Sequence, residues 1–258
     1  MNTRVALVMA GTEGIGRGAA DAIAAQGAAL VVCSRTPERV EQTVEALRDA
    51  GAEASGVAVD VATPDGIAEV FAHVDEVHGR LDVLVSNAGG PPPGNFLDLD
   101  EEAWARGYEL TFMSAVRSIC AAVPRMRAAG AGRIVIIGSS SVRSPLPGLA
   151  LSNAFRPALD GVVKTLAVEL AGEGITVNMV APGRIETARV RSIDARKAEA
   201  QGRAAEEIRA DAEAQIPTGR YGTIAEIGAM VGFLTSPEAS YVTGQCVLVD
   251  GGLVPTLP

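Results

Sequence analysis

A glycine-rich turn follows the first apolar run of the chain. In the segment AGTEGIG, three glycines stand between the apolar run RVALVM (4–9) and a segment with helical periodicity. Glycine lets the backbone approach a diphosphate closely, and the free N–H groups at the amino terminus of a helix favour its negative charge. The candidate ligand-binding residues of this turn are Gly11, Thr12, Glu13, Gly14, Ile15 and Gly16. From this motif alone, a tightly packed turn that binds no ligand remains the alternative.

Seven short apolar runs alternate with longer segments that have helical periodicity. This alternation is typical of βαβ units around a parallel sheet, and strands that helices cover on both faces are apolar throughout. The expected strands are RVALVM (4–9), ALVVCS (29–34), EASGVAVD (53–60), LDVLVSN (81–87), GRIVIIG (132–138), ITVNMVA (175–181) and QCVLVD (245–250). The sequence therefore predicts an α/β protein with a three-layer, doubly wound Rossmann fold and a seven-stranded parallel sheet, formed by residues 1–258 as a single domain.

Several helices have recognisable first residues. A hydroxyl side chain that can cap a helix precedes proline, a residue favoured at the first helical position, in Thr36-Pro37, Thr63-Pro64 and Ser236-Pro237. In LDLDEEAW, Asp100 offers a cap for a helix that runs from about residue 101 to the late 120s. We expect a helix to begin at each of these points.

A charged, alanine-rich stretch interrupts the alternation of strands and helices between residues 186 and 216. It predicts an inserted helical segment that closes over a substrate as a lid. The run of charges between Ala188 and Ala214 is interpreted more simply as a solvated helical face.

Three further segments follow expected strands at the carboxyl edge of the sheet, where open α/β sheets bind ligands. They are Asp60-Val61, SNAGG (86–90) and APGRIET (181–187). The order of glycine turn, DV, NAG, GSSS, PG and terminal VDGG resembles that of the short-chain dehydrogenases and reductases, over essentially the whole chain. The resemblance implies a nicotinamide cofactor bound by the glycine turn together with Asp60, Val61, Asn87, Ala88, Gly89, Pro182, Gly183, Ile185 and Thr187. It also implies that the NAG segment supports the end of its own strand.

The end of the second strand indicates which cofactor is bound. An acidic residue there would bind the ribose hydroxyls of NAD(H), whereas a basic residue accepts the 2′-phosphate of NADP(H). Ser34 and Arg35 stand there, so NADP(H) is favoured over NAD(H), unless Arg35 is only a solvated charge. Glu13 argues the other way, because NADP(H)-preferring members of the family often carry a basic residue at its position. Ala10 replaces the family's first glycine, and Gly11 is expected to restore the lost backbone freedom.

The resemblance also identifies the catalytic positions, most of which have changed. In the family, a tyrosine hydroxyl exchanges a proton while hydride moves between nicotinamide and a carbonyl or alcohol carbon. A lysine four residues later holds the nicotinamide ribose, an upstream serine binds the substrate oxygen, and an asparagine completes a proton relay. Ser139 keeps the serine position, whereas Ser152, Arg156 and Thr111 replace the tyrosine, the lysine and the asparagine.

These replacements change the acid–base chemistry. No tyrosine occurs between Tyr108 and Tyr221, so no shift of the alignment restores one. The hydroxyl of Ser152 is a far weaker acid than a phenol, which titrates near ~10, and it reaches less far. Arg156 can bind the ribose hydroxyls of the cofactor and offset charge on an oxyanion, but its guanidinium keeps its protons at ordinary pH. A water or a group of the substrate would then carry the proton.

Three functions are compatible with such a site. The first is an oxidoreductase that transfers hydride between NADP(H) and a carbonyl or hydroxyl substrate, similar in overall pattern to the 3-oxoacyl carrier-protein reductases, with Ser139, Ser152, Arg156 and Thr111 as catalytic residues. The second is a non-redox enzyme, a lyase or isomerase, on the same fold. The third is a catalytically silent nucleotide-binding protein. Because all the segments expected to bind the cofactor at the carboxyl edge of the sheet are present, the oxidoreductase is favoured.

Other polar side chains have simpler interpretations. His73 and His78 lie on the helix before the fourth strand, so we expect them at the surface and away from the cleft. Arg143 and Ser144 follow the fifth strand in a loop, where either both residues line the substrate pocket or Arg143 is a solvated charge. Tyr108 is interpreted as a packing aromatic.

The composition excludes several partners. The formal net charge of −9 and the lack of a basic run argue against nucleic acid. The three cysteines are far apart and predict neither a disulfide framework nor a metal site, and no apolar run reaches the ~18 residues of a membrane span. We expect a cytoplasmic protein that binds no metal and no membrane, acts on a small-molecule carbonyl or alcohol, and assembles as a homotetramer or homodimer like most members of the family it resembles.

Overall fold

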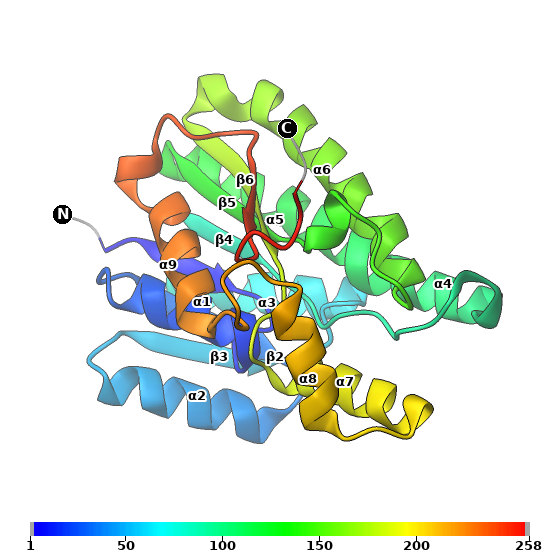
Figure 1. Ribbon diagram of the computed structural model, residues 1–258. Helices are drawn as coiled ribbons and strands as arrows, with labels where there is room; N and C mark the ends of the chain where they lie inside the picture. The colour runs from blue at the N-terminus through cyan, green and yellow to red at the C-terminus, as the bar shows by residue number, and fades with distance from the viewer. Residues whose placement is uncertain (1–2, 256–258) are drawn as a thin grey trace.

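A seven-stranded parallel sheet forms the centre of the molecule (Figure 1). The computed structural model describes residues 3–255. The strands are β1 (Val5–Val8), β2 (Ala29–Ser34), β3 (Ala54–Ala58), β4 (Val83–Ser86), β5 (Gly132–Ile137), β6 (Ile175–Pro182) and β7 (Cys246–Val249), in the order β3-β2-β1-β4-β5-β6-β7. Each lies within or nearly within an expected run, every pair is parallel, and the predicted fold class is confirmed.

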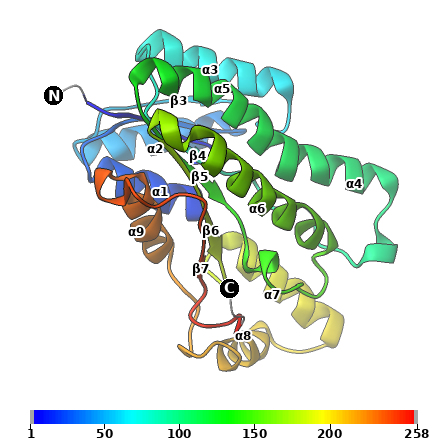
Figure 2. The same cartoon turned by 90° about the horizontal axis from the view of Figure 1, so that it is seen from above.

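Helices cover both faces of the sheet and give it two separate hydrophobic cores (Figure 2). One face carries α1 (Gly14–Ala24), α2 (Pro37–Asp49) and α9 (Ile224–Thr235), and the other carries α3 (Pro64–Val77), α5 (Ser114–Ala129) and α6 (Ala150–Leu170). Alternate residues of a strand point to opposite faces, so in β1 Leu7 joins one core and Val8 the other. Helices on both faces explain why the strands are apolar throughout.

The predicted helix starts agree with the structure at three of four points. Helices α2 and α3 begin at Pro37 and Pro64, and Asp100 caps α4 (Glu101–Tyr108) by accepting the Ala103 N–H at 2.7 Å. A π-helical turn, η2 (Glu109–Met113), joins α4 to α5. The expectation of a helix after Ser236 is wrong: only one 3₁₀ turn, η5 (Pro237–Ala239), follows, because the chain must leave α9 and enter β7 within a few residues.

The remaining elements lie in the connections. Three more 3₁₀ turns are η1 (Phe96–Asp98), η3 (Ser140–Val142) and η4 (Ala171–Glu173). The stretch expected to be an inserted helical segment forms α7 (Ala188–Gln201) and α8 (Ala205–Ala214), which lie beyond the carboxyl ends of the strands, outside the two helical layers (Figure 2). Among the described residues, no helix is long and apolar enough to cross a membrane.

Candidate active site

The glycine turn places unpaired N–H groups at the amino terminus of α1. Gly14 adopts a φ of +54°, a conformation that side chains with a Cβ disfavour, and it opens the helix. Within residues 3–255, the N–H groups of Gly14, Ile15 and Gly16 donate to no acceptor. Such groups at a helix start form a ready site for an anion, so the turn fits the diphosphate of a dinucleotide.

The strained residue of this turn is Ala10. The expectation that Gly11 supplies the backbone freedom lost at Ala10 is therefore wrong. Ala10 has a φ of +45° and is the one non-glycine residue in the left-handed region among those described. Gly11 does not adopt a positive φ; it is needed for space, since a Cβ there would lie 2.7 Å from the Val8 carbonyl oxygen. The family's first glycine is therefore replaced at the position whose conformation requires it, at a strain of about 1 kcal/mol.

The segments at the ends of β4 and β6 meet at the glycine turn. Asn87 Nδ2 donates to the Ala10 carbonyl at 3.3 Å, which ties the NAG segment to the turn. Thr187 caps α7 through Val190 N–H, and a Cβ added to Gly14 would lie 3.5 Å from its methyl carbon. Three segments far apart in the sequence thus surround the helix start.

The other expected cofactor residues differ in how exposed they are. Gly89 is exposed with open space around it, whereas Ile185 is 2% exposed and packs in a core, so only its main chain faces a ligand. Pro182 ends β6, and Gly183 donates its N–H to the Val249 carbonyl at 3.0 Å. Ala88 packs against the other core.

The charged residues near the expected adenosine end differ in whether they form ion pairs. Arg35, just after Ser34 at the end of β2, is exposed and makes no ion pair with any described side chain. Glu13 forms an ion pair with Arg39 at 2.8 Å, a contact the sequence analysis missed. Arg39 therefore offsets the carboxylate that argued against a 2′-phosphate. After β3, Asp60 holds its own turn by accepting the Ala62 N–H at 3.0 Å, and Val61 is buried.

Ser139 and Arg156 come together at the carboxyl end of β5. Ser139 Oγ accepts the Ser141 N–H at 3.1 Å, which orients the hydroxyl at the start of η3. Arg156, from α6, donates to the carbonyl oxygens of Ile137 and Gly138 at 2.6 and 2.8 Å. These two bonds use one nitrogen of the guanidinium, and the other nitrogens have no partner among the described residues.

Ser152 is placed differently from the family tyrosine. It is 6% exposed, and its Oγ lies 3.1 Å from Ser141 Oγ. The hydroxyl is therefore held by a buried partner that the sequence analysis did not identify; the only signal for it was the run of serines in GSSS.

Thr111 borders a small cavity beside Arg156. The residue is 5% exposed, lies in the π-helical turn, and its Oγ1 has no hydrogen-bond partner among the described residues. The cavity, of about 10 Å³, is also lined by Asn87 and Ser114. Its volume is that of about one water molecule, and its walls are polar enough to hold one.

Burial lowers the pKa of the Arg156 guanidinium to about 10, and the positive charge of Arg189 contributes. Arg156 therefore stays cationic at neutral pH. Arg189, in the first turn of α7, donates to the carbonyl oxygens of Gly90 and Pro91 at 2.9 and 2.7 Å. The sequence offered no signal for this residue, which lies within the run of charges interpreted as a solvated face.

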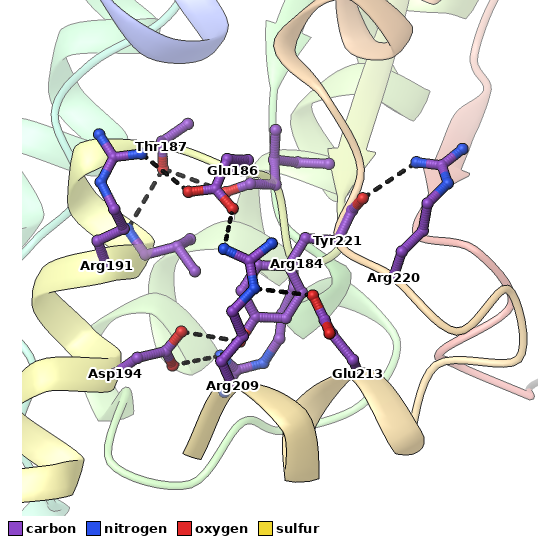
Figure 3. A network of polar contacts seen from close by, with 11 residues as sticks. Arg184, Glu186, Thr187, Arg191, Asp194, Arg209, Glu213, Arg220 and Tyr221 are labelled. Carbon is purple, nitrogen blue, oxygen red and sulfur yellow. Dashed lines mark hydrogen bonds and ion pairs between the residues drawn. The ribbon is translucent and has the colours of Figure 1, made fainter. Parts of the chain in front are cut away.

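The segment of residues 186–216 takes part in a partly buried charge network, so the interpretation of its charges as a solvated face is only partly right (Figure 3). Asp194 is 5% exposed, accepts a hydrogen bond from the Tyr221 hydroxyl at 2.8 Å, and pairs with Arg184 at 2.7 Å. Arg209 pairs with Glu186 at 2.6 Å, and its guanidinium lies 4.9 Å from the centre of the Tyr221 ring. Contacts between α7, α8 and the loops after β6 and before α9 hold the lid together.

The remaining candidates are structural. The side chain of His78 is only 7% exposed, because it packs near Glu53, and His73 contacts Ser55 Oγ at 3.1 Å, so neither is a free surface residue. Arg143 pairs with Asp160 at 3.0 Å. Tyr108 stacks on Phe112 with 5.6 Å between ring centres, as expected for a packing aromatic, although it is 40% exposed. Within residues 3–255, no cluster of His, Cys, Asp or Glu suits a metal ion.

Comparison with known proteins identifies the family. A family model described as enoyl-(acyl carrier protein) reductase matches residues 9–254. The human dehydrogenase/reductase SDR family member 4 is 36% identical over 252 residues, covering 96% of this chain and 87% of that protein. The crystal structure of YwfH, an NADPH-dependent reductase involved in bacilysin biosynthesis, has a TM-score of 0.94 at 28% identity, covering 99% of this chain and 100% of that one. An actinorhodin polyketide ketoreductase solved with NADPH has a TM-score of 0.94 at 35% identity, covering 98% of each chain.

The chain therefore belongs to the short-chain dehydrogenase/reductase family. These relatives are reductases, and they support an oxidoreductase.

Proposed function

We propose that this protein is an NADP(H)-dependent oxidoreductase that transfers hydride between the nicotinamide and the carbonyl or hydroxyl carbon of a small molecule. The observation that carries the proposal is the assembly of Gly14, Asn87 and Thr187 around free N–H groups at the start of α1. The solved relatives named for NADPH support the same cofactor. When bound, the cofactor supplies the hydride; the protein supplies binding, orientation and charge.

Ser139 and Arg156 are the residues we propose for the reacting oxygen. The Ser139 hydroxyl, oriented by the Ser141 N–H, donates a hydrogen bond to that oxygen. Arg156 binds the nicotinamide ribose and offsets negative charge on the oxygen with its unpaired N–H groups. Ser152 supports this arrangement through Ser141.

The proton that the reacting oxygen receives must come from a group other than a tyrosine hydroxyl. The Arg156 guanidinium keeps its proton at neutral pH, since even the lowered pKa of about 10 lies well above 7. We propose that a water held between Thr111 and Arg156 in the adjoining cavity, which has the volume of one water molecule, donates the proton. The positive charge of Arg156 stabilises the hydroxide that is left, which regains a proton from bulk water between turnovers. The lid of residues 186–216 would exclude bulk solvent from this route.

NADPH binding with slow oxidation across a panel of carbonyl compounds is the expected behaviour. In Ser139→Ala, kcat/KM for reduction should fall well beyond tenfold, because one hydrogen bond to the reacting oxygen is lost. Ser240→Ala, which changes an exposed serine in the turn after η5, is the matched control and should keep the wild-type rate. Spectrophotometry of NADPH and calorimetric titration provide the two measurements. Tight NADPH binding with no turnover would instead favour a silent nucleotide-binding protein, and conversion without cofactor would favour a non-redox enzyme.

Arg35→Ala should weaken NADPH binding about 10- to 100-fold and change NADH binding less than threefold. The guanidinium is exposed and unpaired with described carboxylates, so we assign it to the 2′-phosphate that only NADPH carries. Arg106→Ala, which removes an exposed arginine paired with Glu102, is the control. Dissociation constants from fluorescence titration decide the question, and an equal loss for both cofactors would remove Arg35 from phosphate recognition.

Self-association and a cytoplasmic location stay predictions. Large apolar side chains on the described surface, including Leu97 at 92% and Val168 at 84% exposed, are compatible with a homotetramer or homodimer.

A further inference from the structure

Arg189 connects the first turn of α7 to the loop that follows β4. Its two terminal nitrogens donate to the Gly90 and Pro91 carbonyls, and a Cβ on Gly90 would lie 2.1 Å from its guanidinium carbon. The absence of a side chain at residue 90 therefore lets the guanidinium lie flat on the loop. The residue as a whole remains solvent-accessible. A ligand approaching the expected nicotinamide position would meet this charge.

The charge of Arg189 has no carboxylate partner among the described residues. Three of the five arginines of residues 186–216 form ion pairs with carboxylates, namely Arg191 with Glu186, Arg203 with Asp211, and Arg209 with Glu213, whereas Arg189 and Arg196 form none. Neither Arg189 nor Arg156 pairs with any carboxylate of residues 3–255. Their hydrogen bonds go only to backbone carbonyls, which leave a full positive charge on each side chain.

Helix energetics also disfavour a cation at this position. Arg189 lies in the first turn of α7, where the helix dipole is positive and the sequence supplies no acidic residue. Partial desolvation lowers the pKa of Arg189, and its charge in turn helps to lower that of Arg156. Arg156, Arg189 and Arg196, each without a carboxylate partner among the described residues, and a helix amino terminus thus contribute to one region of positive potential, which an anion would relieve.

We propose that this region, the Arg189 site, binds a carboxylate of the substrate, so that the substrate is an oxo acid or hydroxy acid rather than a neutral carbonyl compound. The planar guanidinium of Arg189 matches the two oxygens of a carboxylate. Arg156 adds attraction from the reacting end. This assignment rests on the proposed function, because it places the reacting carbon beside the nicotinamide.

Paired acids and esters test the site without catalysis. The wild-type protein saturated with NADP⁺, which cannot reduce a carbonyl, is titrated calorimetrically with pyruvate and acetoacetate and with their methyl esters. The acids should bind at least tenfold more tightly than the esters. In Arg189→Gln this ratio should fall to about one, whereas Arg203→Gln, which removes an ion-paired lid arginine, should keep it.

The remaining outcomes refute either the Arg189 site or the proposed function, and they tell the two apart. Equal binding of acids and esters to the wild-type protein would refute the Arg189 site. An Arg189→Gln variant that loses NADP⁺ affinity tenfold and keeps the acid–ester ratio would assign Arg189 to the cofactor diphosphate, which also refutes it. Failure of the wild-type protein to bind NADP⁺ would refute the proposed function, and the acid–ester ratio of the cofactor-free protein would then decide the site alone.

Discussion

Arg156→Ala is expected to lower kcat/KM for NADPH-dependent reduction at least a hundredfold. The substitution removes a cation that is held against the end of β5 by two main-chain carbonyls, one of them that of Gly138, the residue before Ser139. Charged donors aimed at a developing oxyanion in a site shielded from water contribute about 3 kcal/mol or more, which is two or more powers of ten in rate. Steady-state kinetics at neutral pH measure the loss.

The conservative variant separates charge from geometry. Arg156→Lys keeps a cation that can donate to the Ile137 and Gly138 carbonyls but loses the other N–H groups of the planar guanidinium, so it should recover activity to within about tenfold of the wild type. Arg106→Ala, with its exposed arginine far from the sheet edge, should retain full activity. A wild-type rate in Arg156→Ala would remove this residue from the mechanism.

The fold and the cofactor edge could be predicted from the sequence because their signals are local. Each strand is a short apolar run, and a parallel sheet places the residue after each strand at one edge, so the glycine turn, Asn87 and Thr187 had to meet there. Helix starts were equally local at Pro37 and Pro64. The failure after Ser236 shows the limit, since a cap and a proline do not reveal how soon the chain must enter the next strand.

The details that decide the chemistry depend on contacts between distant residues. The pairing of Glu13 with Arg39 offsets the carboxylate charge that argued against NADP(H), yet nothing near Glu13 in the sequence indicates this contact. Arg189 looks like one charge among many until its contact with Gly90, almost a hundred residues away, is seen. Charge runs have no period that distinguishes a solvated side chain from one held over a cleft, so the sequence could not identify this residue.

Asp194→Ala should lower the free energy of unfolding by about 2–3 kcal/mol and loosen the lid. Its carboxylate is 5% exposed and neutralises Arg184, whose side chain is 29% exposed, so the loss is discounted from that of a fully buried pair. The pKa of the Tyr221 hydroxyl is raised to about 12, chiefly by burial, so it stays protonated and donates to Asp194 throughout the neutral range. Chemical denaturation and hydrogen exchange over α7 and α8 measure the two effects.

Two matched variants show whether burial of this network is the cause. Tyr221→Phe removes two hydrogen bonds, the one that the hydroxyl donates to Asp194 and the one that it accepts from Arg184 at 3.1 Å, and keeps the Arg184–Asp194 ion pair. It should cost about 1–2 kcal/mol. Asp211→Ala breaks an exposed pair with Arg203 on the same lid and should leave the free energy of unfolding close to that of the wild type. If Asp194→Ala proved no more destabilising than Asp211→Ala, the network would be a surface feature. The lid would then need another source of rigidity to hold Thr187 and Arg189 at the cleft.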